Sequence, residues 1–399
     1  MWNPGKRLRK LVLLSSLYVS QYIPLMFLIQ ALPVFLRQQG VPLETIGLIY
    51  LLGFPLLLKI FWSPFIDRYG FTRWGHYRFW IVCFQLLVAG VSVLCAFVDI
   101  QADFTLMFAL LLLMVTLAAS QDIATDALAV GLLEPSERGW GNGIQMAGNY
   151  LGAILGGGVM LMLLNQLGWT NSVLILAWIS VIALLPILRY REQSAKPVQT
   201  RPAFMDVLNF YSRPGIWRWL LVLAIYMTGG NMANGMFRPL LVDLGLSLAE
   251  IGWLLGVVGN GAAILGAIMA GLLTTSFSRK RSLVVFGIVQ AVATLAYLLP
   301  ASGLDDKFTL HIVTIMMHAA IGATLTVSAT VMMDKSQLAT AGTDYTAQSS
   351  VVYLGGFLAA GLSGFITAAI GYQGLFLLSI AIATLGVVLI SQGQLERFN

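Results

Sequence analysis

Long apolar segments recur along this chain, and a short polar stretch separates each from the next. A helix needs about 20 apolar residues to cross the ~30 Å hydrocarbon core of a bilayer, and these segments reach that length. Lipid offers the backbone no hydrogen-bonding partner, so a spanning segment of this kind is helical. Only 10% of the residues are charged, against about 25% in a soluble domain. The sequence therefore predicts an all-α polytopic membrane protein.

The apolar segments predict twelve transmembrane helices in two groups of six. Their expected ranges are 11–36, 44–66, 78–98, 104–131, 139–165, 169–189, 216–242, 248–273, 281–300, 308–333, 343–370 and 373–392. The one long polar connection contains basic residues and prolines and divides the two groups. We therefore expect an N-terminal six-helix bundle (1–189), a cytoplasmic linker (190–215) and a C-terminal six-helix bundle (216–399).

Basic residues predict the orientation of the chain in the membrane. Lysine and arginine collect in cytoplasmic loops. Here all 23 lie on one predicted side except Arg37, Lys59, Arg238 and Lys307. The N-terminal tail and the C-terminal end share that side, so we expect both termini in the cytoplasm. The net charge of +6 follows from this distribution and predicts no nucleic-acid partner.

A short motif occurs in equivalent places in the two halves. Gln145-x4-Tyr150-Leu-Gly in the fifth predicted helix returns as Gln348-x4-Tyr353-Leu-Gly in the eleventh. Six helices per half restore the same orientation, which predicts a parallel repeat about an axis normal to the membrane. Because they occupy equivalent places, these glutamines and tyrosines are predicted to contact a substrate.

Two carboxylates, Asp122 and Asp126, lie inside the fourth predicted helix. A charge at this depth costs about 2.5–3.5 kcal/mol on insertion scales, so it marks a substrate or proton path by default. Residues four apart share a helix face, and burial with mutual repulsion favours the protonated form of at least one of them. We expect a proton-coupling site here. The alternative is that Asp126 is a structural anchor or gate residue near the cytoplasmic boundary.

Lys59, in the cytoplasmic half of the second predicted helix, is the expected partner of Asp122 or Asp126. A buried and unpaired ammonium is costly, so an ion pair would lower the cost for both groups. The alternative is that Lys59 extends to lipid phosphates at the interface.

Other polar side chains are distributed over the remaining predicted helices. Amides that face lipid are costly, so most should face the bundle interior or a wet cavity, although some could only join neighbouring helices. Besides the repeated motif, the residues predicted to contact substrate are Gln21, Tyr22, Asn149, Asn231, Asn234, Arg238 and His318. The alternative for Arg238 is an arginine that extends to the interface, and for His318 a neutral donor between helices.

The sequence contains no motif for ATP hydrolysis or metal-dependent hydrolysis, and no G-x-S-x-G. Its three histidines are not at ligand spacing, so we expect neither a cofactor nor a metal site. Energy is then expected from an ion gradient, with protons as the coupling ion. A membrane-embedded acyl or glycosyl transferase is the alternative from another class. The short predicted extracellular loops offer it no acceptor-binding segment, so we expect a carrier and not an enzyme.

Two motifs resemble the peptide/acetyl-CoA transporter branch of the major facilitator superfamily. One is K-x2-W-S-P-x2-D-R, from Lys59 to Arg68, and the other is S-Q-D-I-x2-D-A-x10-R-G, which contains Asp122 and Asp126. The resemblance implies a monomer in which two six-helix bundles work by alternating access. It also implies that Lys59, Asp122 and Asp126 match the membrane-embedded charged residues of this family.

Asp67-Arg68-x-Gly resembles the core of the loop between helices two and three of these proteins, which implies a cytoplasmic gate. The corresponding segment of the second half, Ser278–Arg281, lacks the acid. The gate is therefore expected to be asymmetric.

Within this branch the chain most closely resembles the single-protein siderophore importers for rhizobactin and pyochelin. Bacterial muropeptide permeases share the motifs but carry two further helices, for which 399 residues and twelve spans leave no room. The resemblance therefore implies import of a ferric siderophore across the bacterial inner membrane, with membrane lipid around the chain. The alternatives are a muropeptide, another small peptide or a metabolite as cargo, or export by the same fold.

Overall fold

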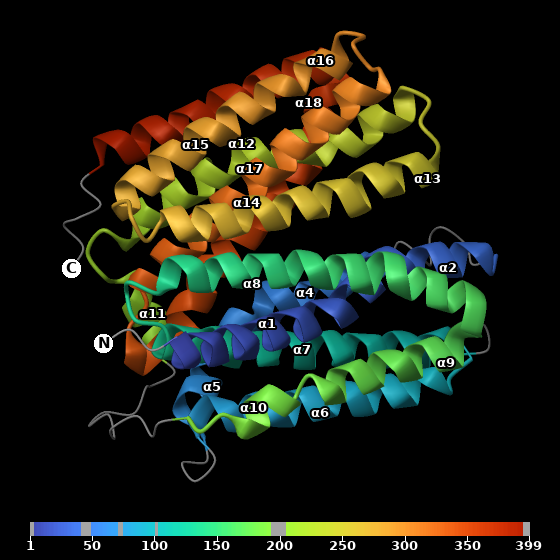
Figure 1. The fold of residues 1–399 in the computed structure, drawn as a ribbon, viewed down its shortest axis with the longest axis vertical. Helices are drawn as coiled ribbons and strands as arrows, with labels where there is room; N and C mark the ends of the chain where they lie inside the picture. The colour runs from blue at the N-terminus through green and yellow to red at the C-terminus, as the bar shows by residue number, and fades with distance from the viewer. Residues whose placement is uncertain (1–3, 41–48, 71–74, 100–102, 193–204, 394–399) are drawn as a thin grey trace. The chain divides into compact units, whose positions relative to one another are not determined.

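The computed structural model of this chain describes residues 4–40, 49–70, 75–99, 103–192 and 205–393 (Figure 1). Every regular element in these ranges is a helix. The all-α class predicted from the apolar segments is therefore confirmed.

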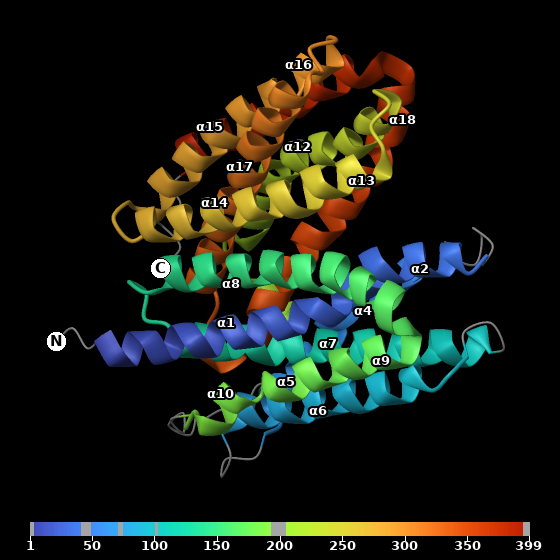
Figure 2. The same ribbon diagram turned by 45° about the vertical axis from the view of Figure 1, so that its right-hand side comes forward.

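Helices of the first half of the chain alternate long stretches with short 3-10 and π segments. They are α1 (Pro4–Met26), η1 (Phe27–Ala31), α2 (Leu32–Gln38), η2 (Ile49–Gly53), α4 (Phe54–Leu58), η3 (Lys59–Phe61), α5 (Ser63–Arg68), α6 (His76–Ala96), α7 (Phe104–Leu132), α8 (Arg138–Ala153), η4 (Ile154–Val159), α9 (Met160–Ile182), α10 (Leu185–Arg189) and α11 (Asp206–Tyr211). In two views α1 runs alongside α7 (Figure 1, Figure 2). The helix that carries Asp122 and Asp126 therefore lies next to the helix that carries Gln21.

The second half has fewer interruptions. Its elements are α12 (Ile216–Asp243), α13 (Leu248–Ile251), η5 (Gly252–Gly259), α14 (Asn260–Leu273), α15 (Arg279–Ala296), α16 (Leu298–Ala301), α17 (Lys307–Asp334), η6 (Leu338–Thr340) and α18 (Ala341–Gln392). Side-chain caps begin several long helices: Asp103 accepts from the Leu106 N–H and Asp306 from those of Phe308 and Thr309. Such caps satisfy backbone donors that the first turn leaves unpaired.

Nine helical stretches of the described residues are long and apolar enough to cross a membrane. Two of them, Arg138–Arg189 and Leu338–Gln392, have 52 and 55 residues. A straight helix of that size would be about 80 Å long, which a ~30 Å hydrocarbon core cannot hold. Each is interrupted by a glycine with positive φ, Gly168 at 74° and Gly371 at 75°, where the chain changes direction (Figure 1). Each therefore supplies two of the predicted spans.

The second predicted span, 44–66, is absent from these nine stretches, and its first residues lie outside the described ranges. From Ile49 onward the chain forms the short pieces η2 to α5 in place of one long helix. Pro55 and Pro64 stand in the first turns of α4 and α5, and proline lacks the N–H that a continuing helix needs. With this broken segment included, the helices are consistent with the twelve predicted spans.

The chain divides into two compact units. Unit 1 consists of Met1–Leu133, Gly148–Val207 and Ser336–Ala347, and unit 2 of Glu134–Ala147, Leu208–Lys335 and Gln348–Asn399. These units differ from the predicted bundles in two short segments: 134–147 belongs with helices of the second half, and 336–347 with helices of the first. Residues 193–204 of the predicted linker lie outside the described ranges.

Each unit has an apolar core of its own. In unit 1 the ring of Trp169 stacks on Phe35 with centroids 5.7 Å apart. In unit 2 the ring of Tyr297 lies 4.3 Å from that of Phe237 and 5.2 Å from that of Phe376. Aromatic pairs at these separations contribute about 0.5–1.5 kcal/mol each beyond the burial of their area.

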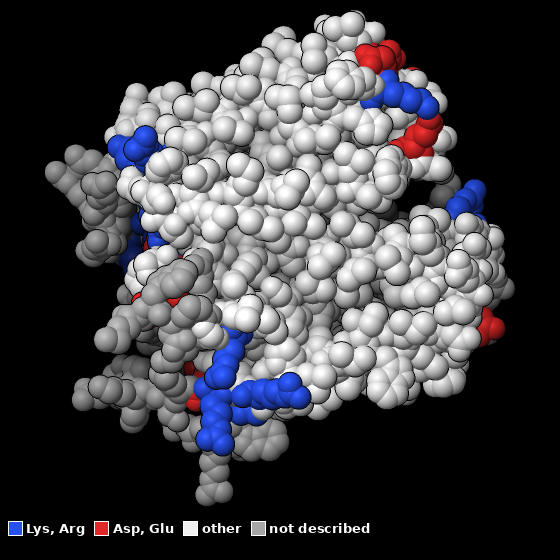
Figure 3. All heavy atoms as spheres, in the orientation of Figure 1, with Lys and Arg blue, Asp and Glu red and all other residues white. Residues whose placement is uncertain are grey.

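Large apolar side chains also cover the outside of the long helices. Leu86, Leu87 and Leu94 of α6 are exposed. In Figure 3 charged atoms lie toward the ends of the helices, with uncharged atoms between them. Apolar surface on this scale is unfavourable in water, and a lipid bilayer removes that cost. The surface is therefore that of a membrane-embedded protein.

Gly148, Gly152 and Gly156 recur every four residues on α8 and η4 and allow a close approach of α1. A methyl group at Gly156 would lie 2.2 Å from the carbonyl oxygen of Ile23, whereas one at Gly158 would meet open space. Small residues at this spacing permit close helix contact within membranes. The close contact between these two helices thus depends on glycine at position 156, which has no side chain.

Gly156→Ala is expected to destabilise unit 1 by about 1–3 kcal/mol, because the backbone of α1 would have to move away from the new methyl group. Gly158→Ala is the matched control, since it lies in the same π segment with no atom within 4 Å of the new carbon. Thermal unfolding in detergent micelles measures both variants. Equal melting temperatures would contradict the close contact.

Candidate functional site

The acidic side chain of Asp122 joins three helical segments inside unit 1. Lys59 forms an ion pair with its Oδ2 atom, and the Gln21 amide donates to its Oδ1 atom. The side chain of Lys59 is 0% exposed and that of Asp122 13%. We call Gln21, Lys59 and Asp122 the Lys59 cluster. It contains one cation and one anion, which together add no net charge to the apolar interior.

The break in the second predicted span places Lys59. Helix α4 ends at Leu58, and the 3-10 segment η3 begins at Lys59 itself. Because the side chain is fully buried, Lys59 does not extend to the membrane interface, which was the alternative considered from the sequence. Of its two predicted partners, Asp122 is the one that forms the ion pair.

Asp126, one turn further along α7, has a different partner. The hydroxyl of Tyr18 donates to Asp126 Oδ1 at 2.9 Å, and both side chains are buried, at 1% and 2% exposed. The sequence prediction missed Tyr18. Its signal was the spacing of three residues to Gln21, which places both on the face of α1 that meets the two acids.

Asp67, at the end of α5, binds the start of helix α18 within unit 1. Its carboxylate accepts from the backbone N–H groups of Gly342 and Thr343 at 3.0 and 2.7 Å, and from the Thr343 hydroxyl at 2.7 Å. The Tyr77 hydroxyl donates to it at 2.9 Å. First-turn N–H groups have no partner within their own helix, and a carboxylate there also meets the positive end of the helix dipole. Asp67 is therefore a cap supplied from a distant part of the sequence.

Two opposing effects act on the pKa of Asp67. Its side chain is only 4% exposed, and this burial raises the pKa of the carboxyl, while the hydrogen bonds from Thr343 and Tyr77 act in the opposite direction. Arg68, the next residue, is half-buried with its guanidinium 5.7 Å from the centre of the Tyr69 ring.

An acid also forms ion pairs at Ser278–Arg281, the segment of the second half that corresponds to the Asp67-Arg68-x-Gly motif. Asp334, at the end of α17, accepts from Arg279 Nε at 2.6 Å and from Arg138 at 2.9 Å, all within unit 2. Arg279 further donates to the carbonyl oxygen of Pro135 at 2.6 Å. The segment Ser278–Arg281 lacks an acid in its own sequence, as noted above. The fold supplies one from another helix, and the two arrangements remain different in kind.

The polar residues predicted on α12 lie on one face of that helix in unit 2. Asn231 is half-buried, and Asn234 and Arg238 are exposed. The Tyr297 hydroxyl donates to Asn234 at 3.4 Å. His318, on α17, is half-buried and lies against Gly259, where an added methyl group would be 2.8 Å from its ring.

The repeated glutamines and tyrosines have different surroundings. Gln348 is 0% exposed, accepts from the Trp219 indole at 2.7 Å and donates to the Met332 carbonyl at 3.1 Å. Both ends of this amide thus form hydrogen bonds between helices, and its contact with a substrate stays a prediction. Gln145 is also buried, whereas Tyr353 is half-buried.

The other predicted contacts of unit 1 lie on α1 and α8. Tyr22, Asn149 and Tyr150 are half-buried. Among the described residues, the oxygens Gln21 Oε1 and Asn149 Oδ1 are buried and have no hydrogen-bond partner. A buried acceptor without a donor costs about 1–3 kcal/mol, so these two atoms favour the approach of a polar ligand.

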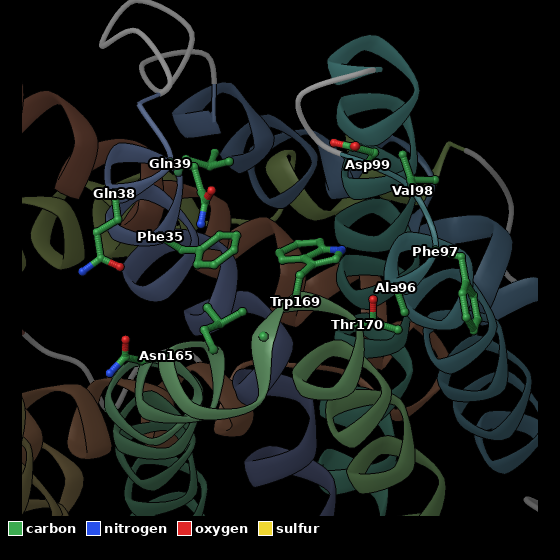
Figure 4. Close-up of a pocket in the computed structure, with 13 residues that line it drawn as sticks. Phe35, Gln38, Gln39, Ala96, Phe97, Val98, Asp99, Asn165, Trp169 and Thr170 are labelled. Atoms are coloured by element: carbon green, nitrogen blue, oxygen red, sulfur yellow. The ribbon is translucent and has the colours of Figure 1, made fainter.

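Unit 1 also contains a cavity of about 700 Å³ at the turn around Gly168 (Figure 4). Its lining combines the rings of Phe35, Phe97 and Trp169 with polar side chains such as Asn165. The Trp169 indole donates to the carbonyl oxygen of Cys95 at 2.9 Å. None of the predicted site residues lines this cavity.

Metal ligands do not gather in the described part of the chain. No group of three or more His, Cys, Asp or Glu residues in these ranges could hold an ion. The candidate residues of unit 1 are the Lys59 cluster and Asp126 with Tyr18, which are largely buried. Those of unit 2 lie on the α12 face, where Asn234 and Arg238 are exposed.

Two family models match this chain in different places. The model of the Major Facilitator Superfamily matches residues 219–392, and that of Acetyl-coenzyme A transporter 1 matches residues 10–107. Relatives extend the similarity over nearly the whole length. The chain is 25% identical to the anhydromuropeptide permease of Escherichia coli (strain K12) over 378 residues, which are 92% of this chain and 76% of the permease.

Both halves of the chain therefore resemble the major facilitator superfamily. A further relative, Putative transporter AmpG 4 of Rickettsia conorii, is 23% identical over 90% of this chain and 91% of its own length. The resemblance to the muropeptide-permease-like branch of the superfamily, read from the motifs around Lys59 and Asp122, is thereby confirmed.

Solved structures show the same fold. The human organic anion transporter MFSD10 (TETRAN) matches with a TM-score of 0.75 at 15% identity, over 97% of this chain and 100% of its own. The transporter FucP in the outward conformation matches with a TM-score of 0.72 at 15% identity, over 96% and 99%. A bacterial homologue of the iron transporter ferroportin matches with a TM-score of 0.71 at 12% identity, over 96% and 98%. At these identities the likeness concerns the fold of this superfamily and not the cargo.

Proposed function

We propose that this chain imports a muropeptide or a related small peptide-bearing solute by alternating access. The observation that supports this cargo is the similarity to the anhydromuropeptide permease over 92% of this chain. It favours the alternative cargo over the ferric siderophore expected from chain length. The ferroportin homologue shares the fold at 12% identity and gives no reason to assign iron.

We propose that the Lys59 cluster couples transport to protons. A proton on Asp122 would cancel its charge and leave the Lys59 ammonium without its counter-ion inside unit 1. That state is unfavourable in an apolar interior unless the surroundings rearrange. Protonation can therefore shift the balance between two arrangements of the helices, which is the requirement for coupling. Asp126 with Tyr18 is a second buried group able to share this role.

The capped helix at Asp67 and the Asp334 pairs support a cytoplasmic gate. Each ties a segment of one sequence half to residues of the other half, within a single unit. Alternating access requires such ties to break in one of the two states. We propose an inner-membrane location, cytoplasmic termini and a monomer, supported by the distribution of basic residues and by the superfamily.

Uptake into proteoliposomes tests this function. Labelled anhydromuropeptide should accumulate when the outside is acidic and the inside electrically negative, and a protonophore should abolish the accumulation. One charge moving through 100 mV provides about 2.3 kcal/mol, which corresponds to roughly 50-fold accumulation. Unlabelled muropeptide should compete with the label, and a ferric siderophore should not.

Two outcomes would reject parts of the proposal. Competition by ferric siderophore alone would restore the siderophore as cargo. Uptake that only equilibrates the label and ignores the protonophore would remove proton coupling and leave facilitated diffusion.

A further inference from the structure

A row of polar side chains runs along one face of α12 in unit 2. Asn231, Asn234 and Arg238 are spaced three and four residues apart, which places them on one side of the helix. Asn234 and Arg238 are exposed, whereas Ala233 and Phe237, on another side, are fully buried. Exposed amides and a guanidinium inside an apolar span are costly against lipid. This face is therefore expected to border an aqueous path.

Arg238 carries a charge that no ion pair neutralises among the described residues. Asp243, at the end of the same helix, accepts from the Tyr372 hydroxyl at 2.6 Å. Glu250, at the start of the next helix, pairs with Lys307 at 3.1 Å. Guanidinium groups match carboxylates through two parallel N–H donors. The unmatched charge is thus suited to an anion from outside the chain.

The position of Arg238 argues against a side chain that extends to the nearer interface. Helical side chains lean toward the N-terminus of their helix, and α12 begins at Ile216, so Arg238 leans toward Asn234 and the middle of the span.

His318 presents an acceptor to its neighbours. Its Nδ1 atom lies 2.9 Å from the carbonyl oxygen of Thr314. That oxygen can only accept, so Nδ1 carries the proton and Nε2 of the neutral ring carries a lone pair. In this neutral form the ring carries no positive charge, so His318 does not supply the charge that an anion requires.

Asn234 adds a donor one turn below Arg238. Its Oδ1 atom accepts from the Tyr297 hydroxyl, so its amide N–H groups remain as donors on the exposed face. Two donor groups on one helix face, one of which carries a positive charge, match a carboxylate.

We propose that Arg238 and Asn234 bind a carboxylate of the transported solute. This assignment rests on the function proposed above and narrows its substrate class to acidic peptides, whose free C-terminal carboxylate suits the site. Neutral amides of the same peptides lack the charge that Arg238 requires.

Binding to the purified full-length chain in phosphatidylcholine nanodiscs tests this site. The probes are an anhydromuropeptide and an unrelated tripeptide, each as the free acid and as the amide. Wild type should bind the acid forms about tenfold or more tightly than the amides. Arg238→Gln should lose this preference through weaker acid binding, with amide affinity unchanged, and Arg238→Lys should retain part of it. Arg37→Gln, which changes an exposed arginine of unit 1, is the matched control and should keep the preference of the wild type.

The outcomes separate the carboxylate site from the proposed cargo. Equal binding of acid and amide by wild type, or a preference that survives in Arg238→Gln, would overturn the site. If the tripeptide acid binds with an Arg238-dependent preference while neither muropeptide form binds, the cargo is wrong and the site stands. If neither probe binds in any form, both fail. If Arg238→Gln changes only the thermal stabilisation by added phosphatidylglycerol, Arg238 binds lipid phosphate and the site is overturned.

Discussion

We expect Asp122→Asn to lower the free energy of unfolding by about 3–5 kcal/mol and to abolish gradient-driven uptake. The substitution removes the carboxylate that pairs with the buried Lys59 ammonium, and removing one partner of a buried pair is much more destabilising than removing both. Lys59→Met should destabilise for the same reason, because it removes the cation that pairs with the Asp122 carboxylate. Thermal unfolding and proteoliposome uptake measure the two effects separately.

The double variant Lys59→Met/Asp122→Asn separates stability from coupling. Without either charge its melting temperature should return close to that of the wild type, while accumulation should stay absent because the proposed proton site at Asp122 is gone. Lys307→Met is the matched control, since its pair with Glu250 is exposed on both sides and such pairs contribute only about 0–1 kcal/mol. A double variant that still accumulates cargo would show that the Lys59 cluster is structural and that coupling lies elsewhere.

Asp67→Ala is expected to have the second large effect, a loss of several kcal/mol with a matching loss of uptake. It removes the acceptor for two backbone N–H groups of α18 and for the hydroxyls of Thr343 and Tyr77. Each buried donor left without a partner costs about 1–3 kcal/mol. Hydrogen exchange of the first turn of α18 and thermal unfolding measure the result.

Thr343→Val is the graded control for this prediction. It removes one hydroxyl donor but leaves both backbone bonds to Asp67 in place, so its effect should be about 1 kcal/mol. Protection of the Gly342 and Thr343 amides that is unchanged in Asp67→Ala would show that the cap does not hold this helix start.

Several features of the fold could be predicted because they depend on local chemistry. The apolar runs required helices, and Asp122 and Lys59 stood out because a charge in such a run needs a partner. Their ion pair was among the pairings predicted. The turns at Gly168 and Gly371 also fell between predicted spans, because two membrane crossings cannot form one straight helix.

Other features depend on which distant segments meet. Tyr18 was missed because its spacing to Gln21 gains meaning only once Asp126 is placed against the same face of α1. Asp334 pairs with Arg279 from the end of another helix. The sequence of Ser278–Arg281 by itself therefore shows only that an acid is missing there. Gln348 matched Gln145 by position, but its amide is used by Trp219 and Met332.

The sequence by itself determined that this chain is embedded in a membrane and that its helices are too apolar for water. It also showed that its few buried charges need a partner. Those conclusions follow from transfer free energies, which each residue carries independently of its neighbours. Only the tertiary structure decided which oxygen faces which donor, because hydrogen bonds and ion pairs act over about 3 Å between helices that the chain order does not align. The packing of the helices therefore determines which carboxylate each of Lys59, Tyr18 and Thr343 contacts.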